Sequence, residues 1–155
     1  MRSDDRPQGF VPDGFAVPRE LVTEEFRLEP LGPEHNEGDY EAWTSSIDHI
    51  RATPGFGGGS WPDPGMTPEE NLADLRRHAE EFAQRSGFTY TVRARGSDRI
   101  IGCVYIYPSG NADGAAKVRS WVRADQADLD AAVHDAVAAW LRDAWPFTTV
   151  SYAPR

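Results

Sequence analysis

Apolar residues alternate with polar ones, or gather in short apolar runs, in five separate stretches of the chain. Both patterns are typical of β-strands. The five stretches are residues 24–31, 88–94, 100–107, 117–123 and 148–152. A turn signal at residues 96–98 joins the second stretch to the third, and a second turn around residues 108–114 joins the third to the fourth. The pattern therefore predicts five strands, of which the middle three follow one another through turns.

Three other segments show the longer period of an amphipathic helix. Large apolar residues between 40 and 50 recur at i, i+3, i+7 and i+10, which predicts one helix through all four. A second helix is expected to begin at residues 67–70, where a capping threonine is followed by proline and glutamate, and to end at Gly87. A third helix is expected over residues 129–141, with Pro146 as its stop.

The predicted order is strand, two helices, three strands, helix and strand. A strand that returns through a helical crossover lies parallel to the strand before it, so residues 148–152 should pair in parallel with residues 117–123. A mixed sheet with helices on both faces follows, in one α/β domain at residues 23–155. Residues 1–22 are rich in proline and glycine, and we expect an arm that is draped over the domain or disordered.

Charge and composition narrow the classes of function. The formal net charge is -9, and the chain has a single lysine, Lys117, so we expect neither nucleic acid nor an anionic membrane as a partner. Neither a secretion signal nor a transmembrane run is evident, which predicts a cytoplasmic protein. Cys103 is alone, and the four histidines lack ligand-like spacing, so we expect no metal.

The junction between residues 118–123 and the following helix has the layout of a phosphate site. Such a junction normally carries glycines, which let several amide N–H groups converge on the phosphate at the positive end of the helix. Here residues 124–130 contain no glycine and three carboxylates, Asp125, Asp128 and Asp130. The layout predicts a nucleotide or coenzyme site, but the chemistry of the junction argues against an ordinary one.

Three segments resemble strands of the GNAT N-acetyltransferase superfamily. Residues 23–31 resemble its opening strand, residues 100–106 its third strand, and residues 121–123 its fourth. The resemblance implies a GNAT-like acyl-CoA N-acyltransferase fold over residues 23–152, acetyl-CoA as the cofactor, and a small-molecule or peptide amine as the acceptor. It also implies that Val122 and Arg123, with Arg119, lie at the coenzyme, because the turn after the fourth strand holds the pyrophosphate in this family.

Two departures from the family pattern affect these expectations. The carboxylates of residues 125–130 replace the glycine-rich pyrophosphate turn, and a carboxylate some 6 Å from a phosphate opposes binding by about 1 to 3 kcal/mol. We therefore expect acetyl-CoA to bind more weakly than tens of micromolar. The chain also ends soon after residues 148–152, where the family continues with more strands. The exposed edge predicts a homodimer over this strand, or the arm folded across it.

The same resemblance implies that residues 55–61 form a wall of the acceptor pocket. His49 is the candidate base for deprotonating an amine, because a near-neutral pKa suits that task. Two functions remain open, an acyl-CoA-dependent N-acyltransferase and a non-catalytic GNAT-like module that binds a small molecule or a protein. The aromatic residues expected to line the pocket are Trp43, Trp61, Tyr107 and Trp121.

Overall fold

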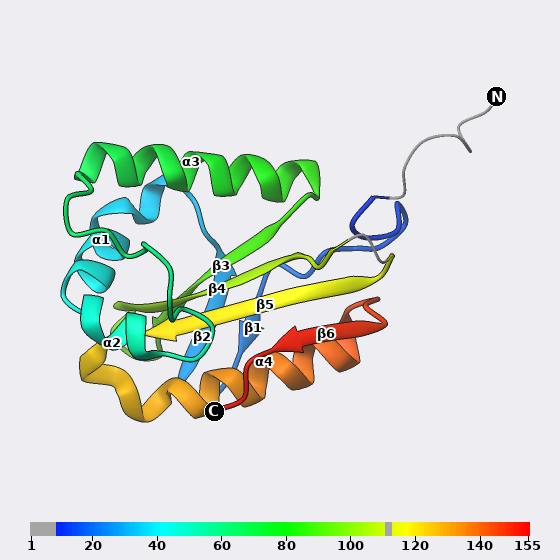
Figure 1. Ribbon diagram of the computed structural model, residues 1–155. Coiled ribbons are helices and arrows are strands. Elements are labelled where there is room, and N and C mark those ends of the chain that lie inside the picture. The colour runs from blue at the N-terminus through cyan, green and yellow to red at the C-terminus, as the bar shows by residue number, and fades with distance from the viewer. Residues whose placement is uncertain (1–8, 111–112) are drawn as a thin grey trace.

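The computed structural model describes residues 9–110 and 113–155, and its centre is one six-stranded sheet (Figure 1). The strands are β1 (Leu21–Val22), β2 (Phe26–Pro30), β3 (Phe88–Ala94), β4 (Ile100–Pro108), β5 (Ala115–Val122) and β6 (Thr149–Tyr152). They lie in sequence order, and every neighbouring pair is antiparallel except β5 and β6, which are parallel. The predicted parallel pairing of the last strand is confirmed.

Helices cover both faces of the sheet, as the element order predicts. They are η2 (Pro33–His35), α1 (Asn36–Thr44), α2 (Ile47–Ala52), α3 (Pro68–Gln84), η3 (Ala124–Leu129) and α4 (Asp130–Ala144). Helices α1, α2 and α3 lie on one face and α4 on the other (Figure 1). The mixed α/β architecture is therefore confirmed, with the two-residue strand β1 added from the segment predicted to be an arm. None of the helices in the described part of the chain is long and apolar enough to cross a membrane.

The single helix predicted across residues 40–50 is wrong, because α1 and α2 are separate helices. The break falls at Ser45 and Ser46, where the backbone of Ser46 leaves the helical region with φ of -137°. The Ser46 hydroxyl accepts a hydrogen bond from the backbone N–H of Ala124 at 2.9 Å, and Ser45 Oγ bonds back to the carbonyl of Ala42 at 3.0 Å. Serine hydroxyls compete for backbone groups in this way, which favours a helix end over a helix interior.

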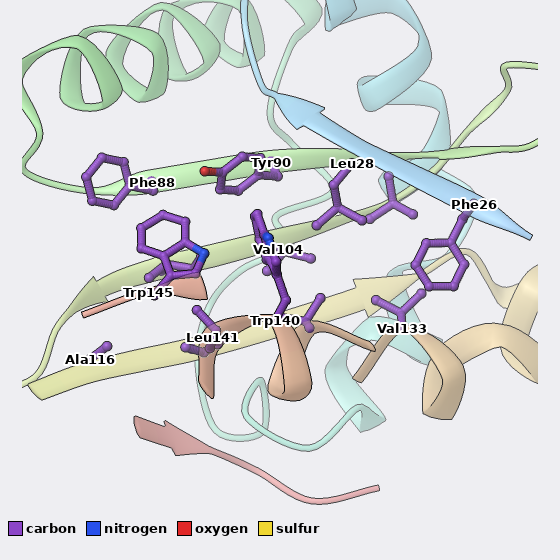
Figure 2. Close-up of a cluster of buried hydrophobic side chains, with 14 of the residues drawn as sticks. Phe26, Leu28, Phe88, Tyr90, Val104, Ala116, Val133, Trp140, Leu141 and Trp145 are labelled. Atoms are coloured by element: carbon purple, nitrogen blue, oxygen red, sulfur yellow. The ribbon is translucent and has the colours of Figure 1, made fainter. Parts of the chain in front are cut away.

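The face of the sheet beneath α4 carries the larger hydrophobic core. Figure 2 shows Trp140 and Leu141 of α4 facing Phe88 and Tyr90 of β3. The described part of the predicted arm packs onto the edge of this core, where Phe15 lies 5.4 Å from the ring of Trp145 and the carbonyl of Pro18 accepts a hydrogen bond from Tyr90. Burying each large apolar side chain stabilises the fold by about 1.5 to 3 kcal/mol. The opposite face has a smaller core, and that face carries the candidate site.

Candidate functional site

A pocket of about 280 Å³ opens on the face of the sheet that α1, α2 and α3 cover. Helix α3 forms one side, the loop of residues 53–67 forms another, and strands β4 and β5 contribute side chains from the sheet. The family resemblance implied an acceptor pocket at this loop. Its lining combines four aromatic side chains with carboxylates, arginines and a histidine, namely Phe56, Trp61, Tyr105, Tyr107, Asp39, Asp74, Arg77, Arg119 and His78.

The aromatic wall of the pocket rests on two buried tryptophans. Trp61 lines the pocket, and its ring lies 5.7 Å from Trp43 and 6.1 Å from Trp121. Trp43 and Trp121 are completely buried behind it, and the Trp121 indole N–H donates to the Tyr105 hydroxyl at 3.0 Å. Of the four aromatics predicted as lining, the structure thus places Trp61 and Tyr107 at the pocket and the other two beneath it.

The buried carboxylate of the pocket is Asp39 on α1, which is 5% exposed. Its Oδ2 accepts a hydrogen bond from Asn71 Nδ2 at 3.1 Å, and the Trp43 indole N–H fixes Asn71 by donating to its Oδ1 at 3.1 Å. No described residue donates to Asp39 Oδ1. Burial raises the pKa of Asp39 to about 6, which the hydrogen bond from Asn71 and the charge of His35 oppose. The sequence analysis missed Asp39, although its position four residues before Trp43 places it on the apolar face of α1.

A polar network involving α3 closes one end of the pocket. The Tyr107 hydroxyl donates to Glu81 at 2.6 Å, and its oxygen lies 3.0 Å from His78 Nδ1, which is 3.1 Å from the Thr89 hydroxyl. Burial and the charge of Arg77 lower the pKa of His78, while burial and the bond to Glu81 raise the pKa of Tyr107 to about 12. Both His78 and Tyr107 are therefore neutral at pH 7 and act as hydrogen-bonding groups.

Arg119, predicted near the coenzyme phosphates, lies on the pocket face of β5. Its guanidinium is 4.8 Å from the centre of the Phe56 ring and 5.7 Å from that of Tyr105, which are cation–π distances. Gly55, in the loop beside Arg119, has a φ of +98°, a backbone conformation that favours glycine. No carboxylate in residues 9–110 or 113–155 lies within 4.0 Å of Arg119.

The candidate base His49 lies elsewhere. It is half-buried on α2 and lines a separate hollow with residues 44–48, Arg51, Pro64 and Ala124. Its Nε2 is buried and finds no hydrogen-bond partner in the described part of the chain. The structure therefore does not bring His49 together with Trp61 and Tyr107 at the pocket, and the role of His49 as a base stays a prediction.

The junction after β5 is held by ion pairs between its own side chains and neighbouring ones. Arg123 is 6% exposed and contacts Glu41, and its Nε donates to Asp125 Oδ1 at 3.3 Å. Asp125 also accepts from Arg99 at 2.8 Å, and this bond, with the charges of both arginines, holds the pKa of Asp125 below its usual range. Arg123, which follows Val122 and was predicted to face the coenzyme phosphates, thus forms ion pairs with carboxylates of the protein.

The edge of β5 beyond its pairing with β6 is also occupied. The parallel pairing runs from Ala115 to Val118, and the buried side chain of Arg155 lies at the next part of β5. Arg155 donates to Asp130 Oδ2 at 2.6 Å and to the carbonyl of Ser120 at 2.6 Å. Side chains of the chain itself therefore fill the space between β5 and the start of α4.

Tyr152 and Cys103 have structural surroundings. The Tyr152 hydroxyl bonds to Ser120, its ring lies 4.2 Å from His134, and burial raises its pKa to about 12. Cys103 is fully buried, and burial raises the pKa of its thiol well above the usual range. In the described part of the chain, no group of three or more His, Cys, Asp or Glu side chains is arranged to hold a metal ion.

Neither a protein-family model nor a curated protein sequence matches the chain. Solved structures do match. The ribosomal-protein-S5-alanine acetyltransferase of Vibrio fischeri superposes with a TM-score of 0.62 at 14% identity, over 79% of this chain and 66% of its own. A GCN5-related N-acetyltransferase from Brucella melitensis gives 0.62 at 14% identity, over 84% and 58%.

The microcin C7 self-immunity acetyltransferase MccE, solved with acetyl-CoA and AMP, superposes with a TM-score of 0.65 at 15% identity, over 82% of this chain and 67% of its own. The chain spans about two thirds of the length of such structures. Identities this low establish the fold and leave substrates open. With its strand order and these neighbours, the chain has the GNAT N-acetyltransferase fold.

Proposed function

We propose that this chain binds a small amine-bearing molecule in the pocket beside Asp39. The observation that carries the proposal is a buried carboxylate without a cation, since no Lys, Arg or His among the described residues lies within 4.0 Å of Asp39. A carboxylate with a pKa of about 6 is mostly ionised at pH 7.5. Burying an unpaired charge is costly, and the ammonium group of a ligand would supply the missing partner.

The other walls of the pocket support the same ligand. Trp61, Phe56 and Tyr105 offer aromatic surface, which attracts ammonium groups and buries the carbon skeleton of a small molecule. His78 and Tyr107, both neutral at pH 7, add hydrogen-bonding groups without adding positive charge that would repel an amine. The site therefore places the buried carboxylate of Asp39 beside aromatic surface, in a pocket whose lining also includes Asp74, Arg77 and Arg119.

Thermal unfolding with matched probes tests this proposal. At pH 7.5, 2-phenylethylamine should raise the melting temperature and 2-phenylethanol, its uncharged counterpart, should not, because a ligand of the native state stabilises it by mass action. Asp39→Asn should abolish the response, since the amide can keep the bond from Asn71 but carries no charge. Asp74→Asn is the matched control, because Asp74 is 40% exposed and already faces Arg77 at 3.6 Å. Equal responses to amine and alcohol would contradict the proposal.

A second candidate function is acetyl transfer from acetyl-CoA to that amine. Two observations favour it, the solved neighbour with bound acetyl-CoA and the edge of β5 from Arg119 to Val122, which pairs with no strand after Val118. In this reading Asp39 would accept the proton that the ammonium must lose, and the amine nitrogen would then attack the thioester carbonyl. The C–N bond forms, the C–S bond breaks, and the thiolate that leaves takes up the second proton lost by the nitrogen. Arg155 would have to leave β5 for the coenzyme to enter.

An acetylation assay separates the two candidates. The binding module predicts amine binding without product, whereas the transferase predicts free thiol released from acetyl-CoA in proportion to the amine supplied. Asp39→Asn should remove the product in the transferase reading, and His49→Ala tests the other candidate base independently. Release of thiol without any amine present would argue against both.

A further inference from the structure

We propose that the ligand of this pocket carries a carboxylate as well as an amine, so that its class is that of free α-amino acids. The inference rests on the proposed function, the amine beside Asp39, and adds Arg119 as the group that recognises the second charge. Both residues line the one pocket, Asp39 from α1 and Arg119 from β5.

Arg119 differs from Arg77, the other arginine of the pocket. Arg77 faces Asp74 at 3.6 Å and Glu81 at 3.2 Å, so carboxylates of the protein already balance its charge. Arg119 contacts the rings of Phe56 and Tyr105 but no carboxylate of the described residues. A guanidinium that contacts aromatic rings through its face leaves the N–H groups at its edge free to donate hydrogen bonds. The planar, forked arrangement of these N–H groups matches the two oxygens of a carboxylate.

Asp39 and Arg119 carry opposite charges in the same pocket and form no ion pair with each other. This arrangement suits a ligand that offers an ammonium group to one and a carboxylate to the other. The volume of about 280 Å³ lies just below the range usual for drug-sized ligands, which fits one amino acid better than a longer peptide. A peptide N-terminus has the ammonium group but an amide instead of the α-carboxylate, so Arg119 distinguishes the two classes.

The apolar lining indicates which amino acids to test. Leu31 and Leu75 join Trp61 and Phe56 around the pocket, and none of these four side chains offers a charge to a polar ligand side chain. We therefore expect apolar amino acids, with L-phenylalanine and L-leucine as the probes.

Calorimetric titration with three molecules of one carbon skeleton tests the inference. L-phenylalanine carries both charges, 2-phenylethylamine only the ammonium and 3-phenylpropanoate only the carboxylate. L-phenylalanine should bind at least about tenfold more tightly than either relative, because a charge-assisted bond is lost in each. L-phenylalaninamide, which mimics a peptide N-terminus, should behave like the amine. L-leucine, 3-methylbutylamine and 4-methylpentanoate repeat the series with a smaller side chain.

Arg119→Gln provides the decisive variant. It should reduce the affinity for L-phenylalanine to that for 2-phenylethylamine while leaving the amine itself unaffected, a pattern that a purely structural role of Arg119 would not give. Lys117→Gln, an exposed change two residues away on the same face of β5, should alter neither affinity.

The outcomes separate this inference from the proposed function. Equal binding of the amine and the amino acid to the unmodified protein would overturn the inference and leave the amine site in place. An equal fall in the affinity for all probes in Arg119→Gln would also overturn the inference. If neither series contains an amine or an amino acid that binds, the inference and the proposed function fail together.

Discussion

The two sides of β5 differ in how their charges are balanced. On the pocket side, neither Asp39 nor Arg119 has an oppositely charged side chain within 4.0 Å among the described residues. On the α4 side and at the end of the strand, Arg123 contacts Glu41 and Asp125, and Arg155 bonds to Asp130.

This difference is why we propose the pocket, and not the junction after β5, as the ligand site. The buried charge of Asp39, without a close counter-charge, reduces the stability of the free protein, and a ligand that supplies the opposite charge recovers that free energy. Arg119 is exposed, so water solvates its charge in the free protein. Ion pairs within the protein have the reverse effect, since a coenzyme must compete with them for the same cations. In our proposal, one GNAT fold thus presents a pocket suited to a ligand, while side chains of the protein occupy the junction after β5, where the family resemblance predicted a coenzyme.

The largest expected effect is on stability at Asp39. The folded-state pKa of about 6 exceeds the usual value of 3.8, so the native state holds this proton more tightly than the unfolded state. The free energy of unfolding should therefore fall as pH rises from about 4 to about 6, by about 3 kcal/mol at most. Asp39→Asn should lack this fall and be the more stable protein above pH 7.

Urea unfolding of both proteins between pH 4 and pH 8 measures this difference. His35 and Asp74 are the charged groups that also act on Asp39, so Asp74→Asn serves as the control and should keep the fall. Equal stability of Asp39→Asn and the unmodified protein at pH 8 would show that the buried carboxylate is not the unbalanced charge described above.

The next effect concerns acetyl-CoA and the occupied region. We expect calorimetry to give a dissociation constant above tens of micromolar, because carboxylates replace phosphate-binding amides. Asp128→Asn together with Asp130→Asn should improve the affinity by about a hundredfold or more if the coenzyme uses this junction, since the change removes two repulsive charges and the partner of Arg155. Submicromolar binding to the unmodified protein would contradict the contrast between the two regions.

A smaller change in affinity is expected at the aromatic wall. Trp61→Ala should weaken binding of 2-phenylethylamine by about tenfold, because an aromatic anchor in a pocket contributes 1 kcal/mol or more. His49→Ala should leave this affinity unchanged, since His49 lines a different hollow. If His49→Ala reduces the affinity for the amine as much as Trp61→Ala does, the ligand lies nearer α2 than we propose.

The smallest effect concerns assembly, where we propose a homodimer through the free edge of β6. Val150 is 37% exposed on that strand, and an unpaired edge invites a second strand. Light scattering should give twice the monomer mass, and Val150→Lys should shift the balance toward monomer because edge charges oppose pairing. A monomer at all concentrations would refute the dimer without affecting the pocket.

Much of the fold follows from local pattern. The period-two stretches identify β2 to β6, and the crossover rule orients β6 against β5, because both depend on residues close in sequence. The division between α1 and α2 does not follow, since Ser46 is bonded by Ala124, 78 residues away. The helical spacing of the apolar residues, taken alone, predicts one continuous helix.

The candidate site was harder to predict than the fold. Trp61 was recognisable because an aromatic residue in a glycine-rich loop stands out, whereas Trp43 and Trp121 look equally suitable in sequence and are buried instead. Asp39 and Arg119 are candidate site residues because neither has an ion-pair partner among the described residues. A sequence does not show which charges remain unpaired after folding.

The pH dependence of amine affinity tests the central claim most directly. The ammonium of 2-phenylethylamine stays charged from pH 5 to pH 8, so a change in affinity reports the protein. We predict that calorimetry finds constant affinity above pH 7 and a fall approaching tenfold per pH unit below about pH 6, as Asp39 gains its proton, whereas Asp39→Asn shows no detectable binding at any of these pH values. An affinity of the unmodified protein that stays constant from pH 5 to pH 8, or binding to Asp39→Asn with the same fall, would assign the site to another group and contradict the account.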